Sequence, residues 1–288
     1  MNRAFLITGA LILMTFLTQA QVVPRVGTLP VTGTTSTSGI SGGKIYASDP
    51  TPTIKGVCWG THPNPEYPAD NHTLDGNGMD PFTSQITGLI PYTKYYLRAY
   101  ASNTVGTGYG NQVVFWSVGI GDPFQGGKVF YFLQPGDVGY DPELQHGLIA
   151  PAADLVIQFE WGSPSSVMWS TFDEIGKGEV NTAEILKWHR NYCDPNKDPV
   201  LAADACHRMS VSYSGECYND WFLPSVNELT ELYKNKDFVG GFLTQPGNIY
   251  WSSSENKRTS ARSVSFDEGS ILNTNKSFKI RVRCIRDF

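Results

Sequence analysis

The stretch Asn219–Tyr233, which reads NDWFLPSVNELTELY, constrains the fold more than any other part of this sequence. Ser225 and Glu228 have the spacing of a capping box, in which the Ser oxygen accepts from the Glu amide and the Glu side chain reaches back. Apolar residues follow at helical spacing, at Val226, Leu229 and Leu232. The pattern predicts a buried aromatic segment, a capped turn and then a short amphipathic helix.

A chain of 288 residues is long enough for about two domains. Its 29 Gly and 18 Pro residues fit a fold with short strands and many turns. The net charge of −5 provides no positive field that would attract nucleic acid. We therefore expect a packed protein without a nucleic-acid partner.

Residues 1–20 have the pattern of a secretory signal peptide. Asn2 and Arg3 precede an apolar run over Ala4–Phe16, and a small residue, Ala20, marks the expected cleavage site. This run is shorter than the roughly 20 residues that a membrane-spanning helix needs. No Cys follows it, so we expect no lipoprotein, no membrane span, and a protein that is secreted or held at the cell surface or outer envelope.

The five cysteines are Cys58, Cys193, Cys206, Cys217 and Cys284. Export would permit disulfides. The four cysteines of the second half allow three pairings, and their spacing does not choose among them. A zinc site is disfavoured because the chain has no Cys-x-x-Cys pair. We expect no metal site.

The segment 22–118 carries short β-branched and aromatic runs between turn residues, which predicts an all-β domain. Leu89-x-Pro91-x-Thr93-x-Tyr95 resembles the start of the sixth strand of fibronectin type III domains, where the Tyr hydroxyl bonds to upstream backbone. Other pieces resemble a fibronectin-like repeat of secreted Bacteroidetes proteins, namely Gly56–Thr61, Asn64-Pro65, Phe82–Leu89 and Gly108–Asn111. This resemblance implies a seven-stranded sandwich, with Cys58 as a buried free thiol. Calcium is not supported, because Asp75–Asp80 lacks the EF-hand pattern.

Residues 119–123 form a short Gly/Pro linker, and the pattern changes to mixed α and β over 124–288. Asn181 is expected to cap a helix. Residues Lys279–Arg286 are expected to form the last strand.

Several motifs occur in order over 124–288: Gly-Gly-Lys-Val-Phe-Tyr, His-Gly-Leu-Ile-Ala, Gly-x-Gly-x-x-Asn-Thr, Ala-Ala-x-x-Cys, Asp-Trp-Phe-Leu-Pro-Ser-x-x-Glu-Leu, Tyr-Trp-Ser-Ser-Ser-Glu and Val-Arg-Cys-Ile-Arg. The ordered set resembles the Legionella collagen-like protein C-terminal domain family and the Fibrobacter succinogenes major paralogous domain. Phe222 departs from the usual Arg or Tyr of that family. The resemblance implies an α+β fold similar to C-type lectins. It also implies a Cys206–Cys284 bridge, which leaves Cys193 and Cys217 to pair with each other.

No residue is predicted to be catalytic. The five histidines form no metal-binding array, and Gly176-x-Gly178 lacks the rest of a dinucleotide fingerprint. We expect no cofactor.

The end of the chain has a local excess of basic residues. The candidate binding residues are Arg258, Arg262, Lys279, Arg281, Arg283 and Arg286. Exposed Arg can hold sulfate or carboxylate groups through two hydrogen bonds, and the family resemblance implies adhesion to sulfated polysaccharides. The alternative is that Arg281, Arg283 and Arg286 pair with acidic neighbours.

The sequence thus favours an exported, non-enzymatic binding or adhesion protein whose partner is a glycan or a cell-surface protein. A structural subunit of a cell-envelope assembly is the alternative, and the oligomeric state stays open. An enzyme of the formylglycine-generating type is the third hypothesis, since such enzymes share a lectin-like fold.

Overall fold

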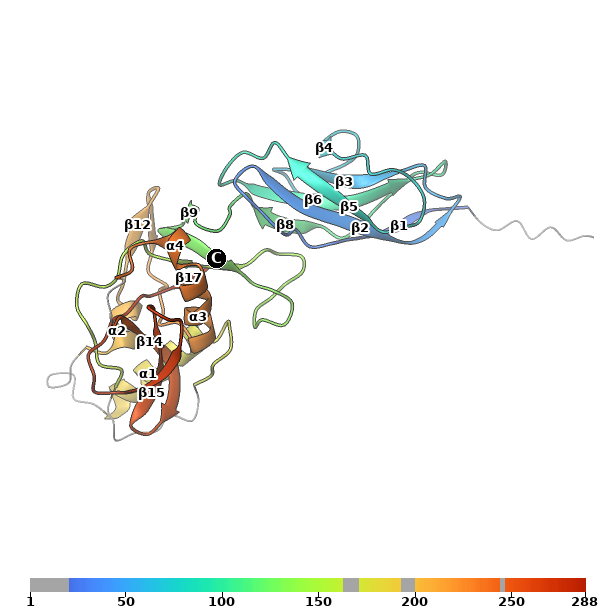
Figure 1. Cartoon of the computed structure of the whole chain (residues 1–288). Helices are drawn as coiled ribbons and strands as arrows, with labels where there is room; N and C mark the ends of the chain where they lie inside the picture. The colour runs from blue at the N-terminus through green and yellow to red at the C-terminus, as the bar shows by residue number, and fades with distance from the viewer. Residues whose placement is uncertain (1–20, 163–170, 193–199, 244–246) are drawn as a thin grey trace, which may run out of the picture.

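The computed structural model describes residues 21–162, 171–192, 200–243 and 247–288, and these are mostly in β-sheets with a few helices (Figure 1). The predicted signal peptide, residues 1–20, lies outside the described residues. Within the described ranges, no helix combines the length and apolarity needed to cross a lipid bilayer.

The N-terminal part contains two antiparallel sheets. Its strands are β1 (Val22–Thr28), β2 (Ser38–Asp49), β3 (Ile54–Gly60), β4 (Asn71–His72), β5 (Phe82–Thr87), β6 (Lys94–Ser102), β7 (Thr107–Tyr109) and β8 (Val113–Trp116). One sheet has the order β1-β2-β5. The other has the order β4-β3-β6-β7, and β8 pairs with the first half of β6.

The two sheets bury one shared hydrophobic core, so this part is a β-sandwich. Strand β5 alternates buried and exposed residues along its whole length, as expected for a strand with one face in a core. The first sheet contributes Val26 and Ile86, and the second contributes Val57, Leu97 and Phe115. The all-β expectation for this segment agrees with the observed sheets.

The Tyr95 hydroxyl and the Cys58 thiol both lie as the sequence predicts. The Tyr95 hydroxyl accepts a hydrogen bond from the Ile90 amide at 2.9 Å, so the Tyr reaches upstream backbone as expected. The Cys58 thiol is fully buried and lies 3.2 Å from the Pro65 carbonyl. Burial raises the pKa of Cys58 to about 12, which keeps the thiol protonated and unreactive at neutral pH.

The C-terminal part mixes short strands and helices. Its elements are β9 (Pro123–Phe124), β10 (Gly127–Phe132), β11 (Gly147–Ala150), α1 (Gly178–Tyr192), α2 (Ala202–His207), β12 (Val211–Tyr213), β13 (Glu216–Tyr218), α3 (Val226–Lys234), α4 (Lys236–Val239), β14 (Ile249–Lys257), β15 (Ser260–Ser265), β16 (Ile271–Asn275) and β17 (Arg286–Asp287). The sheets have the orders β17-β11-β10-β9, β12-β13 and β14-β15-β16.

The predicted capping box is present. Ser225 precedes α3 and accepts from the Glu228 amide, while the Glu228 carboxylate accepts from the Ser225 amide at 2.7 Å. Val226, Leu229 and Leu232 of α3 are buried in a second core with Phe266 of the β15–β16 turn region. The stretch chosen from the sequence therefore does organise this part of the fold.

Two secondary-structure expectations were wrong. Helix α1 begins at Gly178, so Asn181 lies inside its first turn and is not its cap. The Asn181 amide instead donates to the Phe172 carbonyl and to the Ser253 hydroxyl, because the side chain is fully buried there. The predicted last strand is reduced to β17, and the residues before it make single bridges with separate segments, such as Tyr250↔Arg281.

The two parts are joined by more than the linker. The connection between β10 and β11 runs onto the sandwich (Figure 1), where Leu144 forms a parallel bridge with Val114 of β8. The Val114 amide donates to the Glu143 carbonyl at 2.7 Å, and the Gln145 amide donates to the Val114 carbonyl at 2.9 Å. The Gln145 side chain also donates to Thr34 at 3.0 Å. A segment of the C-terminal part thus covers an edge of the sandwich.

A disulfide ties α2 to the final segment of the chain. Cys206 and Cys284 are bonded, and their Cα atoms are 5.4 Å apart, within the usual range for a disulfide. This is the pairing that the family resemblance implied. The second expected pairing is not among the described contacts, in which Cys217 has a free, exposed thiol 3.1 Å from the Ser210 hydroxyl. Its expected partner, Cys193, lies outside the described residues.

The Cys206–Cys284 bond should contribute strongly to stability. It closes a loop with a sequence separation of 78 residues, which corresponds to about 4–5 kcal/mol in the chain-entropy model. We expect Cys206→Ala/Cys284→Ala to lower the free energy of unfolding by up to this amount in urea denaturation. Cys217→Ala is the matched control and should have little effect. Equal stability of the two variants would contradict this role for the bond.

Candidate functional site

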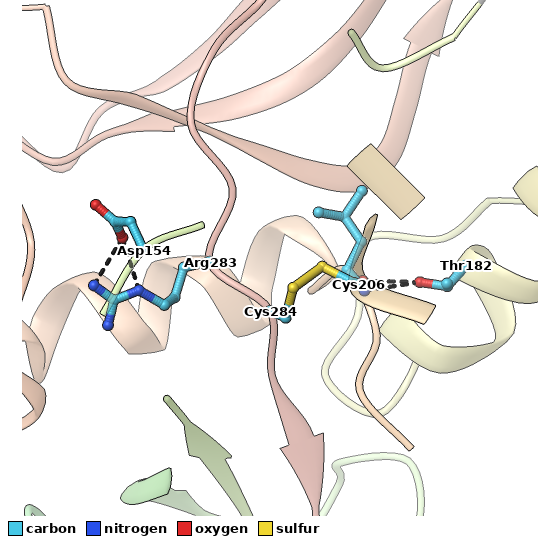
Figure 2. Close-up of a disulfide and its surroundings, with 6 residues drawn as sticks. Asp154, Thr182, Cys206, Arg283 and Cys284 are labelled. Atoms are coloured by element: carbon cyan, nitrogen blue, oxygen red, sulfur yellow. Dashed lines mark hydrogen bonds and ion pairs between the residues drawn. A yellow bond between two sulfur atoms is a disulfide. The ribbon is translucent and has the colours of Figure 1, made fainter. Parts of the chain in front are cut away.

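Arg283 does not belong to an exposed basic surface, which corrects the prediction for this residue. Its side chain is fully buried and forms an ion pair with Asp154 at 2.7 Å (Figure 2). The remaining guanidinium hydrogens are donated to backbone carbonyls of Pro151, Gly240 and Gly241. Every direction of the guanidinium is therefore used within the fold, and none is left for a ligand.

Arg286 also has a structural role. It makes two hydrogen bonds to the Asp220 carboxylate, each 2.6 Å long, and a third to Gln125 at 2.7 Å. Its guanidinium lies over the ring of Tyr218. Burial raises the pKa of Asp220, but the hydrogen bonds and the charge of Arg286 outweigh it, so the net pKa is lowered. The alternative of pairing with acidic neighbours thus describes Arg283 and Arg286.

The other four candidates lie at or near the surface in different settings. Arg262 pairs with Asp173 at 3.2 Å, and Arg281 donates to Asn248 at 3.1 Å. Arg258 and Lys279 are exposed. With Arg283 and Arg286 buried, the predicted basic rim is reduced to these four residues at or near the surface.

Glu228 is the carboxylate that sequence reasoning used for capping, and it has a further task. It is completely buried, and its Oε1 accepts from the Gly176 amide at 2.8 Å and the Gly178 amide at 3.3 Å. A Cβ at position 178 would lie 2.2 Å from Glu228 and 2.8 Å from the ring of Phe222. Gly178 is therefore required by its close approach to the buried carboxylate, whereas Gly176 has a φ of +81° and a Cβ there would lie 2.2 Å from the Val138 carbonyl oxygen. Neither glycine needs a nucleotide to explain it.

A groove lies between the sandwich and the C-terminal part. Its volume is about 570 Å³, and we call it the interdomain groove. One wall is formed by the segment 29–34 together with parts of β2 and β5, and the other by the segments 132–135 and 140–146. Sequence reasoning missed this groove, because no motif relates these two distant segments.

The lining of the interdomain groove is apolar with uncharged polar groups. No Lys or Arg of the described ranges lines it, and its carboxylate is the exposed Asp141. His146 is held by a contact of 3.1 Å between its Nδ1 and the Phe288 carbonyl. Such a lining has the composition of sites that bind small molecules, where apolar walls carry a few polar groups.

A smaller cavity of about 320 Å³ lies beside α1, next to residues 219–222. Its ionisable lining residues are Glu179, Arg190, His207 and Asp220. Burial raises the pKa of Glu179, and the nearby carboxylates of Asp287 and Asp220 raise it further. Because Asp220 is already held by Arg286, this cavity offers fewer free groups than its composition suggests.

Comparison with known proteins assigns one segment of the chain. Residues 163–286 match the model of the Lcl C-terminal domain family. The match includes Cys206, Cys284 and the Ser225–Glu228 capping box, so it covers the framework of the C-terminal part. The walls of the interdomain groove all lie outside the segment matched to the Lcl C-terminal domain. No curated protein matches the chain.

The role of Arg283 as an internal anchor can be tested by Arg283→Met. Removing one partner of a buried ion pair should destabilise the fold by about 3–5 kcal/mol, because Asp154 would remain charged and buried. Lys279→Met is the control, since an exposed position should change stability by less than about 0.5 kcal/mol. Urea denaturation measures both, and a similar small effect at the two positions would refute the anchoring role.

The raised pKa of Glu228 predicts that the free energy of unfolding depends on pH. Burial raises its pKa from 4.5 to about 7 in the folded state, although the Ser225, Gly176 and Gly178 amides oppose this. The folded chain then holds this proton more tightly than the unfolded chain. The stabilising contribution is complete below pH 4.5 and is lost as the pH rises to about 7.

We therefore expect Glu228→Gln to cost most at low pH. The difference in unfolding free energy between the wild type and the variant should narrow as the pH rises from 4.5 to about 7. Denaturant titrations at both pH values measure it. Glu216→Gln, at an exposed site in β13, is the control and should show no such change. A difference that widens with pH would show that the carboxylate is preferentially ionised in the fold.

Proposed function

We propose that this chain is an exported, non-enzymatic binding or adhesion protein. In this proposal a C-type-lectin-like domain is presented on a fibronectin type III-like spacer, and the partner is a glycan or a cell-surface protein. The single observation that carries it is the match of residues 163–286 to the Lcl C-terminal domain family. The contact between Tyr95 and the Ile90 amide supports the fibronectin-like assignment of the sandwich.

Three ionisable side chains that could have bound a ligand are used inside the fold. Arg283, Arg286 and Glu228 each satisfy backbone or carboxylate groups inside the fold. The burial of the two arginines weakens the case for a sulfate-binding rim on the last segment. Of the predicted basic surface, Arg258 and Lys279 are exposed in the structure.

Two other functions remain to be distinguished from this one. A structural subunit of an envelope assembly would use both parts for protein contacts. The free thiol of Cys217 favours, as a second candidate, an enzyme of the formylglycine-generating type. Such an enzyme would need paired cysteines, and Cys193 lies outside the described residues. If the wild type converts a substrate and Cys217→Ala does not, while both bind the same partner, the enzymatic function is identified.

The binding function can be tested with the chain from Gln21 onward, which lacks the predicted signal peptide. We expect it to bind a neutral or sulfated glycan on an array, or a protein on a bacterial or host cell surface. The control is the same chain after heat denaturation. A salt-insensitive oligomer of defined size in light scattering, with no binding to glycans or cells, would instead favour the structural subunit.

A further inference from the structure

We propose that the interdomain groove is a binding site for a short neutral oligosaccharide that contacts both parts of the chain. This inference rests on the proposed binding function and specifies its site and its class of ligand. It concerns residues outside the segment matched to the Lcl C-terminal domain family. The position of the groove, the order of its walls and the chemistry of its lining carry the argument.

The position of the groove favours a ligand site. Cavities at the junction of two domains are common places for small ligands, and the volume of about 570 Å³ falls within their usual range. The C-terminal wall is attached to the sandwich next to the groove by the backbone bonds of Val114 with Glu143 and Gln145. The spacing of the walls is therefore set before any ligand binds.

The sandwich wall is also ordered by its own hydrogen bonds. Thr32 and Ile40 exchange backbone bonds of 2.8 and 2.9 Å, and the Leu29 amide donates to the Gly42 carbonyl at 3.0 Å. The Ser41 hydroxyl adds a bond of 2.8 Å to the Leu29 carbonyl. A wall that is already ordered loses little conformational freedom on binding, so even a few contacts could give useful affinity.

The lining carries two kinds of surface close together. Apolar side chains include Ile40, Phe132 and Leu133, and groups with hydroxyl, amide or carboxylate functions include Thr83, Gln134 and Asp141. Two of these groups already make one internal hydrogen bond: Gln134 donates to the Phe132 carbonyl, and Asp141 accepts from the Glu143 amide. A purely apolar ligand would cover their remaining hydrogen-bonding capacity without replacing the water bound there, which is costly. A sugar ring presents C–H faces to the apolar walls and hydroxyls that both donate and accept to the polar groups.

The lining disfavours an acidic ligand, because its one carboxylate is Asp141 and it contains no Lys or Arg among the described residues. An anionic sugar would lie beside Asp141 with no Lys or Arg among the described lining residues to compensate it. Polar groups that are buried without partners, and charges without counter-ions, reduce affinity strongly. The groove therefore favours an uncharged saccharide, and binding to it should depend little on salt.

Strand β5 supplies a matched pair of variants. Thr83 and Thr87 are both exposed on the same face of β5, but Thr83 lines the groove and Thr87 does not. Thr83→Arg should fill the groove with a bulky charge, whereas Thr87→Arg makes the same change outside it. Gln134→Ala, at an exposed site on the opposite wall, removes an amide without adding bulk.

The experiment measures binding of the chain from Gln21 onward to an array of neutral and sulfated oligosaccharides at low and high salt. We expect the wild type to bind neutral oligosaccharides equally at both salt concentrations. Thr83→Arg should weaken this binding at least about tenfold, which is a loss of about 1.4 kcal/mol. Gln134→Ala should weaken it less, and Thr87→Arg should bind like the wild type. Equal thermal unfolding temperatures confirm that all variants are folded.

Each other result overturns the inference in a distinguishable way. If Thr83→Arg and the wild type bind neutral glycans equally, the site lies elsewhere, and the proposed binding function stands. If the chain binds only sulfated glycans, and only at low salt, the proposed ligand class is wrong and the binding function stands. The same conclusion follows if the chain binds a surface protein and no glycan. Absence of binding to both glycans and cells refutes the binding function as well.

Discussion

The ion pair between Arg283 and Asp154 is the contact on which the C-terminal part most depends. Figure 2 shows Arg283 and its neighbour Cys284 leaving the chain in opposite directions, one toward Asp154 and the other toward Cys206. The same short segment therefore carries an ionic anchor on one side and a covalent anchor on the other. Arg283 also donates hydrogen bonds to three backbone carbonyls of irregular segments, which are not paired within a regular sheet or helix.

Glu228 performs the corresponding task as an acceptor of hydrogen bonds. Its side chain accepts hydrogen bonds from the amide of Ser225, which caps its own helix, and from the amides of Gly176 and Gly178. Loops must have their buried polar groups paired, and a fold with many irregular segments needs such partners inside it. The C-terminal part thus uses buried ionisable side chains to hold loops in place, which explains why the ionisable residues of the sequence are a poor guide to its surface.

The sequence was informative where the interaction is local or leaves a recognisable pattern. The Ser225–Glu228 capping box spans three residues, so spacing could predict it, and the contact of Tyr95 with Ile90 spans five and was implied by the resemblance to fibronectin type III domains. Arg283 was assigned to a basic rim because its partner Asp154 lies 129 residues away and is marked by no motif. The expected last strand shows the same limit, because Ile280, Arg281 and Ile285 each form a bridge with a different segment.

The interdomain groove likewise depends on contacts between residues that lie far apart in the sequence. Its two walls are related by long-range contacts such as the bond from Gln145 to Thr34, which joins residues 111 positions apart. Neither the family match to the C-terminal part nor the strand pattern of the sandwich contains this relation. A site formed by both parts requires each to be present and docked, because removal of either removes one wall. Its specificity is therefore a property of the pair of domains, and a family defined by one domain does not determine the ligand.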